Sequence, residues 1–266
     1  MTNFIFSRKQ ISSNHLGKLD GGFSLLEMAI VLAIVSLLMA GLLPSLTSQM
    51  EQQRRTETRK QLDELQQALL GFAISNGRLP CPADGAIASG QLNAGLEATT
   101  GTGSALTCSN VTGSAAWGVL PWATLGVSET DAWGRRYTYR ISTVFADASS
   151  ANTFGTGCTP GIVPTLSSFA LCSPGNLTVL SAATGGSNMA TGIPVVVVSH
   201  GSNGFGAYTP QGTQISASND PDEADNSNTT NTTYVSHSFT PVFDDLVVWV
   251  SPNILFNRMV VAGKLP

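Results

Sequence analysis

A single carboxylate, Glu27, stands near the start of a long apolar stretch, where an ionised side chain is costly. Between Phe23 and Leu43 the polar residues are Ser24, Glu27 and Ser36. An acidic side chain deep in a bilayer costs about 2.5–3.5 kcal/mol on insertion scales, so its presence here favours a function. A charge in an apolar setting is stabilised by an opposite charge close by. The pattern therefore predicts a cationic partner for Glu27.

A second group of oxygen-rich side chains lies between Asn219 and Asn226. Asp220, Asp222 and Asp225 carry carboxylates, the ligands that Ca²⁺ takes within a set of six to eight oxygens. The spacing differs from that of an EF-hand loop, because no Gly or distal Glu stands at the required places. Two interpretations remain open, a calcium site on these three aspartates and a flexible acidic loop.

The sequence offers little that could catalyse hydrolysis. Ser199 and His200 are adjacent, so on a strand their side chains point to opposite faces and cannot act as a nucleophile and its base. Asp244 and Asp245 fit a strand cap and turn more simply than acid–base chemistry. No Gly-x-Ser-x-Gly elbow, phosphate-binding loop or HExxH motif occurs. We therefore predict that the chain is not an enzyme.

Four cysteines, Cys81, Cys108, Cys158 and Cys172, predict two disulfides if the chain is exported. Proximity favours Cys81 with Cys108 and Cys158 with Cys172, although three connectivities are open. A zinc site is disfavoured, because no CxxC pair or nearby His provides the usual ligand spacing.

The composition agrees with an exported chain. Only 11% of the 266 residues are charged and the net charge is −4, whereas an ordinary soluble domain carries about 25% charged residues. The globular part has no basic patch, so nucleic acid is not a predicted partner. We expect no bound cofactor other than the Ca²⁺ considered above.

A long helix must carry Glu27. At about 1.5 Å per residue, about 20 apolar residues are enough to cross a hydrocarbon core. The helical pattern continues to about Ser75 and stops at Asn76-Gly77. Pro44 predicts a kink, and a true helix end at Leu43 is the alternative.

The second half of this predicted helix has an apolar stripe at helical spacing. Its members recur every three or four residues and should pack against a sheet. They are Leu62, Leu65, Ala68, Leu69, Phe72 and Ala73.

The globular part has several strand patterns. Residues 137–141 alternate, residues 176–180 form a short candidate strand, and residues 193–200 and 244–251 contain β-branched runs. Trp117, Leu120 and Trp122 are expected core anchors. We interpret Arg135, Arg136 and Arg140 as the solvated face of a strand, with a binding patch as the alternative. The predicted fold class is α+β, a long N-terminal helix packed on a small antiparallel sheet with long disulfide-pinned loops.

The segment Gly22-Phe23-Ser24-Leu25-Leu26-Glu27 resembles the cleavage and methylation motif of type IV pilins and of type II secretion pseudopilins. It follows a leader in which Arg8, Lys9 and Lys18 outnumber Asp20, and it precedes the apolar helix, as in that family. The turn from Asp131 to Gly134 before a strand, and the two later strands separated by a Gly-rich turn and an acidic loop, are similar to the pseudopilin pattern.

The resemblance implies a role for each residue of the motif. A prepilin peptidase would cut between Gly22 and Phe23 and methylate the new amino group of Phe23. Glu27 would accept the ammonium of Phe23 from a neighbouring subunit during assembly. Some pseudopilins bind calcium in the C-terminal half of the fold. The implied partners are the peptidase, other pilin or pseudopilin subunits, an inner-membrane assembly platform and membrane lipid.

These expectations divide the chain into a leader (1–22), a transmembrane and assembly helix (23–46), its amphipathic continuation (47–76) and a periplasmic pilin-like domain (77–266). The predicted function is a structural filament subunit, with the size and long loops favouring a minor one. It would wait in the bacterial inner membrane as a single-pass protein. The alternatives are a membrane-anchored periplasmic enzyme and a binding or adhesin domain. The sequence does not distinguish a pilus, a secretion pseudopilus and a DNA-uptake filament.

Overall fold

A computed structural model describes residues 22, 24–148 and 166–265, with the backbone alone for 40–46. The chain divides into two compact units, Met1–Gln49 and Met50–Pro266. The predicted leader, apart from Gly22, and Phe23 lie outside the described residues, and so does Cys158.

Helix α1 runs from Leu25 to Asn76. It continues through Pro44, which rules out the alternative of a helix end at Leu43. It ends where Asn76-Gly77 predicts, because Gly77 has a φ of +70° and its N–H bonds to the carbonyl of Ala73.

The main sheet of the second unit has five antiparallel strands in the order β10-β8-β5-β4-β3. These strands are β3 (Val111–Thr112), β4 (Ala115–Val119), β5 (Thr138–Ser142), β8 (Val195–Ser199) and β10 (Leu246–Val250). The three patterns at 137–141, 193–200 and 244–251 thus correspond to adjacent strands at the centre and one edge of this sheet. The β-branched run of β8 is buried throughout, as a strand covered on both faces requires.

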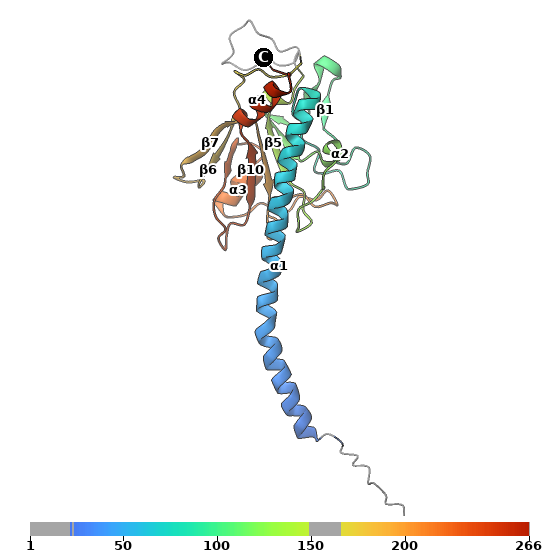
Figure 1. Ribbon diagram of the computed structural model, residues 1–266, viewed down its shortest axis with the longest axis vertical. Helices are drawn as coiled ribbons and strands as arrows, with labels where there is room; N and C mark the ends of the chain where they lie inside the picture. The colour runs from blue at the N-terminus through green and yellow to red at the C-terminus, as the bar shows by residue number, and fades with distance from the viewer. Residues whose placement is uncertain (1–21, 23, 149–165, 266) are drawn as a thin grey trace, which may run out of the picture. The chain divides into compact units, whose positions relative to one another are not determined.

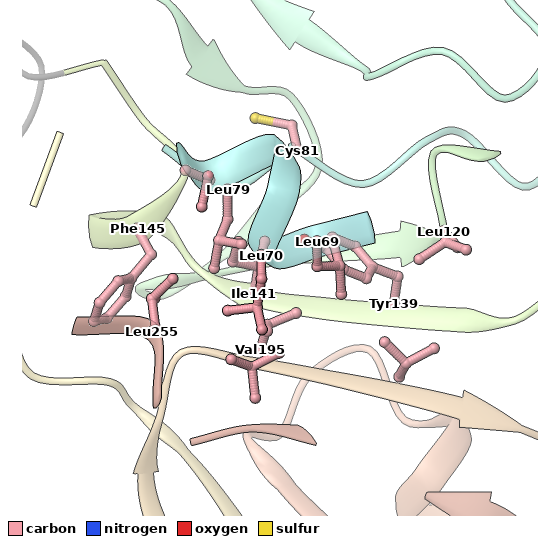
Figure 2. Packing of buried hydrophobic residues seen from close by; sticks show 14 of the residues in the cluster. Leu69, Leu70, Leu79, Cys81, Leu120, Tyr139, Ile141, Phe145, Val195 and Leu255 are labelled. Atoms are coloured by element: carbon pink, nitrogen blue, oxygen red, sulfur yellow. The ribbon is translucent and has the colours of Figure 1, made fainter. Parts of the chain in front are cut away.

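One face of this sheet packs against α1. Leu62, Leu65, Leu69 and Ala73 are buried in one cluster with residues of β5 and β8, as the helical stripe predicts. Figure 2 shows Leu69 and Leu70 beside Ile141 and Val195. Burying a leucine contributes about 1.5–3 kcal/mol, so this stripe is a main source of the stability of the second unit.

A second sheet covers the opposite face. It has three strands in the order β7-β6-β9, namely β6 (Leu177–Leu180), β7 (Asn188–Ile193) and β9 (Thr233–Val235). Leu177, Val179 and Tyr234 cluster with Val196 and Val198 of β8. Strands β6 and β9 run parallel, so the prediction of one antiparallel sheet is correct for the main sheet only.

Smaller elements complete the second unit. The C-terminal helix α4 (Pro252–Val261), which the sequence patterns did not indicate, buries Leu255 and Met259 in the same cluster as α1. In Figure 1 it is the red helix above the sheet. The others are β1 (Thr99–Thr100), β2 (Thr107–Cys108), α2 (Trp122–Leu125), α3 (Pro221–Ser227) and the 3₁₀ turns η1 (Gly103–Ala105) and η2 (Thr143–Phe145).

The prediction of a solvated strand face for the arginines is wrong. Arg136 is fully buried and Arg140 is 1% exposed. The Arg136 guanidinium pairs with Glu129 and donates to backbone carbonyls, and Arg140 donates to the carbonyls of Thr229 and Asn231 at 2.6 and 2.8 Å. The alternation of side chains along β5 indicates that the strand has two different faces. It does not show that the polar face is in water, and here other segments of the chain cover that face.

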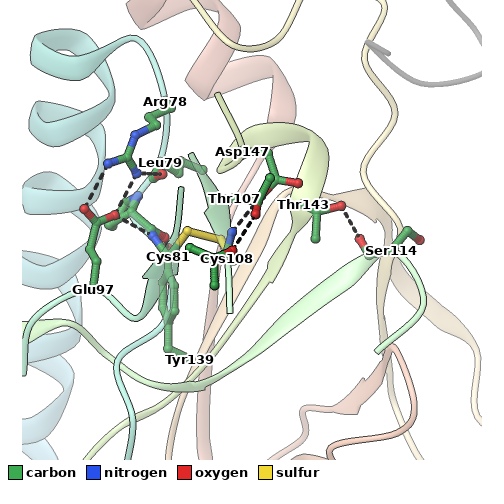
Figure 3. Close-up of a disulfide and its surroundings, with 12 residues drawn as sticks. Arg78, Leu79, Cys81, Glu97, Thr107, Cys108, Ser114, Tyr139, Thr143 and Asp147 are labelled. Atoms are coloured by element: carbon green, nitrogen blue, oxygen red, sulfur yellow. Dashed lines mark hydrogen bonds and ion pairs between the residues drawn. A yellow bond between two sulfur atoms is a disulfide. The ribbon is translucent and has the colours of Figure 1, made fainter. Parts of the chain in front are cut away.

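The segment after α1 is pinned by a disulfide between Cys81 and Cys108, with Cα atoms 5.3 Å apart. Figure 3 shows the ion pair beside it, in which Arg78 binds both carboxylate oxygens of Glu97 at 2.7 and 2.9 Å. Glu97 also accepts the N–H of Cys81 at 2.6 Å. Of the expected core anchors here, Leu120 and Trp122 are buried and Trp117 is half-buried.

Candidate functional site

The start of α1 forms a reciprocal cap between Ser24 and Glu27. The N–H of Ser24 donates to Oε2 of Glu27 at 3.2 Å, and the N–H of Glu27 donates to the hydroxyl of Ser24 at 3.1 Å. This is a capping box, in which two otherwise unpaired helix-end donors are satisfied. We did not predict this cap, although the spacing Ser-x-x-Glu in the sequence is typical of it. The Glu27 carboxylate thus lies beside the residue that follows Phe23.

The first turns of α1 display apolar side chains without cover from the described chain. Each large apolar residue between Leu25 and Met39 is at least 43% exposed. A continuous surface of this kind marks a site for burial against protein or lipid. Its members are Leu25, Leu26, Met28, Ile30, Val31, Leu32, Ile34, Val35, Leu37, Leu38 and Met39.

In the described part of the chain, no helix combines the length and the apolarity that crossing a membrane demands.

The turn that begins at Asp131 attaches α1 to the sheet. Oδ1 of Asp131 accepts the N–H groups of Trp133 and Arg135, each at 3.0 Å, and Oδ2 accepts the hydroxyl of Ser199 at 2.6 Å. The N–H of Ala132 donates to Thr58 of α1. Burial raises the pKa of Asp131, and these hydrogen bonds oppose the shift. Asp131 therefore ties the turn to β8 and presents it to the helix.

Four residues around the start of the second unit form a clasp on α1, defined here as Glu51, Arg55, Trp133 and Phe239. The indole N–H of Trp133 donates to Oε2 of Glu51 at 3.1 Å, and Oε1 of Glu51 accepts Nε of Arg55 at 3.1 Å. The guanidinium of Arg55 stacks 3.7 Å from the ring centroid of Phe239. The clasp fixes the point on the helix at which the globular contacts begin.

Ser199 and His200 face different partners, as their adjacency predicts. Ser199 bonds to Asp131, whereas Nε2 of the fully buried His200 lies 2.7 Å from the hydroxyl of Thr138. Nδ1 of His200 lies 3.6 Å from Oδ1 of Asp245. The two side chains thus do not form a nucleophile–base pair, and His200 serves as a hydrogen-bonding residue at the strand end.

The acidic segment is a helix instead of a flexible loop. Asp220 caps α3 by accepting the N–H groups of Asp222 and Glu223, and Pro221 occupies the first turn, which are ordinary helix-start signals. Oδ1 and Oδ2 of Asp222 contact the N–H of Ala183 and the ring of His237, and Asp225 accepts the side-chain amide of Asn231. Each of the three predicted calcium ligands thus binds separate protein donors, and their part in metal binding stays a prediction.

A different set of carboxylates gathers nearby, namely Glu223, Asp244 and Asp245. One ligand oxygen from each lies within 4.8 Å of the others, and the three residues are 1%, 5% and 5% exposed. Burial raises the pKa of Glu223, and the charge of Asp245 adds to the shift. Glu223 and Asp244 are 21 positions apart in the sequence, so no local spacing signals the cluster.

The other gathering of ligand-type side chains in the described residues consists of Cys81, Cys108 and Asp147. Its sulfur atoms are joined in the disulfide, so they are not thiolate ligands. Among the described cysteines none is free. The predicted bond from Cys172 involves Cys158, which is outside the described residues.

Residues 18–43 match the family model of the prokaryotic N-terminal methylation motif, the signature of type IV pilins and pseudopilins. The match includes Gly22, Phe23 and Glu27, and it covers the capping box and the exposed apolar turns of α1. No curated protein and no solved structure matched the chain.

Proposed function

We propose that the chain is a structural subunit of a type IV pilus or a type II secretion pseudopilus. The methylation motif implies processing by prepilin peptidase and assembly with other pilin subunits. The observation that carries the proposal is the position of Glu27, a carboxylate at the base of an apolar helix surface that the described chain leaves exposed. Helix-to-helix packing in a filament would bury that surface.

Cleavage between Gly22 and Phe23 would leave a new ammonium on Phe23, the residue before Ser24. The Glu27 carboxylate already bonds to the N–H of Ser24, so it points to the end of the helix where that ammonium would arise. In an apolar surrounding the pair of opposite charges lowers the cost of burying either one. An ammonium from a neighbouring subunit would meet the same carboxylate, and the pair would fix the register between two helices.

The second unit would then lie outside the cytoplasmic membrane, as the disulfide between Cys81 and Cys108 supports. Before assembly the apolar start of α1 would be held in the inner membrane, and an assembly platform would extract it. The large second unit, with three sheets and long connections, favours a minor subunit over the repeating subunit of the shaft.

The test is the mass and N-terminal sequence of the protein purified from membranes, in strains with and without prepilin peptidase. We expect a chain that starts at methylated Phe23 only where the peptidase is present. Glu27→Ala should be processed normally and be missing from sheared filaments. An intact Met1 in both strains would contradict the proposal and would favour an anchored domain with another task.

The abundance of the chain in sheared filaments separates a minor from a main subunit. A ratio to the main pilin well below one supports the minor role. A ratio near one would assign the chain to the shaft.

A further inference from the structure

The buried arginine of β5 has a positive charge that the described chain does not balance. Arg140 is 1% exposed, and no carboxylate of the described residues forms an ion pair with its guanidinium. We propose that Arg140 binds a monatomic anion, chloride, in a small cavity between the main sheet and the segments that cover it. This inference does not depend on whether the chain enters a filament.

Two backbone carbonyls hold the guanidinium of Arg140 in place. Its Nη1 donates to the carbonyl of Thr229 at 2.6 Å, and its Nη2 donates to the carbonyl of Asn231 at 2.8 Å. These acceptors fix the plane of the guanidinium, but a carbonyl oxygen is neutral overall and does not cancel a full charge. Buried charges in proteins are normally paired, so the charge of Arg140 requires a counter-ion.

The remaining nitrogen of the guanidinium, Nε of Arg140, is buried and has no hydrogen-bond partner in the described part of the chain. Buried polar atoms are nearly always paired, and an unpaired donor on a charged group is more costly than one on a neutral group. An anion would accept this hydrogen bond and balance the charge at the same time.

The phenol beside Arg140 does not serve as the counter-ion. Burial lowers the pKa of Arg140, and Tyr234 opposes that shift. Burial also raises the pKa of Tyr234, so its phenol is uncharged at neutral pH. An arginine keeps its proton at neutral pH even when it is buried. A negative charge for Arg140 would therefore come from solution.

Arg140 lines a cavity that is large enough for one such ion. The cavity lies between β4 and β5 on one side and the segment from β8 to the end of α3 on the other. Trp117, Tyr208 and Tyr234 are its aromatic walls, and the exposed Gln214 lies at its rim.

The size of this cavity selects a small anion. It offers about 20 Å³ to the centre of a water-sized particle, and a single water needs about 10–15 Å³. A chloride ion is only slightly larger than a water molecule, whereas sulfate or phosphate carries four oxygens around a central atom. The cavity thus fits a halide and excludes an oxyanion.

Gln214 provides a second donor for the anion. Its Nε2 donates to the carbonyl of Gly206 at 3.1 Å, and the amide nitrogen has two hydrogens. The other hydrogen would bind the anion from the rim of the cavity. In a site that is largely closed to water the attraction between chloride and Arg140 is stronger than in solution.

The test compares chloride with a larger anion on the full purified chain. We expect the Tm to be about 2 °C or more higher in KCl than in potassium gluconate at the same ionic strength, because the ion binds only the folded chain. The chlorine NMR line of KCl should broaden when the protein is added, and KBr should reverse the broadening. Absence of either effect would overturn the proposal and would assign the cavity to water.

Arg140→Met removes the charge and keeps an unbranched stem, and we expect the affinity for chloride to fall by about tenfold or more. Arg135→Met is the matched control, because Arg135 lies just before β5, donates to the carbonyl of Gly201 and does not line the cavity. Its affinity for chloride should equal that of the unmodified chain. Binding lost in Arg135→Met and kept in Arg140→Met would overturn the proposal.

Gln214→Met is a second test that remains available if Arg140→Met does not fold, because Gln214 is exposed. The variant loses the amide donor at the rim, and its affinity for chloride should fall by about threefold or more. An unchanged affinity would contradict a site in this cavity.

Competition by sulfate distinguishes the cavity from an open surface site. Sulfate should leave the chlorine line broad at the concentration at which bromide reverses the broadening, because it does not fit beside Arg140. Equal competition by the two anions would place chloride on the open surface and would overturn the assignment.

Discussion

The carboxylate of Glu27 and the backbone of Ser24 are joined at the first turn of α1, at 3.2 Å from Oε2 to the N–H. The residue expected to receive a charge from another subunit therefore has an intramolecular partner in the single chain. Under the proposed function, subunit pairing would use the same carboxylate that caps the helix, and substitutions can separate the two roles.

Glu27→Gln should keep the cap and lose filament assembly. The amide oxygen of Gln still accepts the N–H of Ser24, but it has no charge to pair with an ammonium. Ser24→Ala should remove the hydroxyl half of the cap, at a cost of about 1 kcal/mol in the local helix, and keep assembly. Sheared-filament yield measures assembly, and amide exchange in the first turn measures the cap. Equal assembly by Glu27→Gln and the unmodified chain would show that the charge is not needed.

Removing the disulfide should destabilise the second unit. The bond between Cys81 and Cys108 closes a sequence separation of 27 residues. A disulfide that closes a loop of that length lowers the entropy of the unfolded chain, and this raises the free energy of unfolding by about 3–4 kcal/mol. We expect the double variant Cys81→Ser/Cys108→Ser to unfold at a clearly lower denaturant midpoint. An unchanged midpoint, with the disulfide verified in the unmodified protein, would contradict this.

Arg136→Lys should be costly although the charge is retained. The guanidinium of Arg136 contacts Glu129 and donates to the carbonyls of Gly85, Ile87 and Pro210. A lysine ammonium has three donors on a flexible stem and cannot reproduce this set. We expect a loss of about 2–4 kcal/mol in the free energy of unfolding.

Arg135→Lys is the control for that change, because Arg135 is less buried and its guanidinium donates to the carbonyl of Gly201 at 3.2 Å. Chemical denaturation of both variants gives the comparison. Similar losses in the two would contradict the assignment of a structural role to Arg136 in particular.

Asp131 should make stability depend on pH. Burial raises its pKa above the value of 3.8 expected for the unfolded chain, so the folded state binds the proton more tightly. Stability from this group is therefore present below pH 3.8 and is lost as the pH rises through the folded pKa. Asp131→Asn removes the titration. Its stability relative to the unmodified chain should increase from pH 4 to pH 7, as followed by thermal unfolding. A constant difference would show that the pKa is not raised.

Elements with strong local signals were predictable from the sequence. The helical spacing of Leu62, Leu65 and Leu69 predicts that these side chains are buried, and they are. The β-branched run of β8 predicts a buried strand in the same way. The buried state of Arg140 was not predictable, because it depends on the weakly patterned loop at Thr229 and Asn231 that covers it.

The cluster of Glu223, Asp244 and Asp245 was not predicted, for a similar reason. Asp244 and Asp245 are adjacent, but Glu223 joins them only because α3 packs beside β9 and the start of β10. Hydrogen bonds from Asn203 and Asn226 complete the arrangement, and neither residue belongs to a recognisable ligand motif. The cap at Ser24 is different, since the Ser-x-x-Glu spacing was available in the sequence.

The clasp should behave as one coupled unit. Trp133 and Phe239 do not touch α1 at the same residue, but Glu51 bonds to Trp133 and to Arg55, and Arg55 stacks on Phe239. Trp133→Phe removes the indole N–H and Phe239→Leu removes the ring face, and each should cost about 1 kcal/mol. Because the Glu51–Arg55 pair links them, the double variant should lose less than the sum, by about 0.5 kcal/mol or more. Additive losses in denaturant unfolding would mean that the two contacts hold the helix independently.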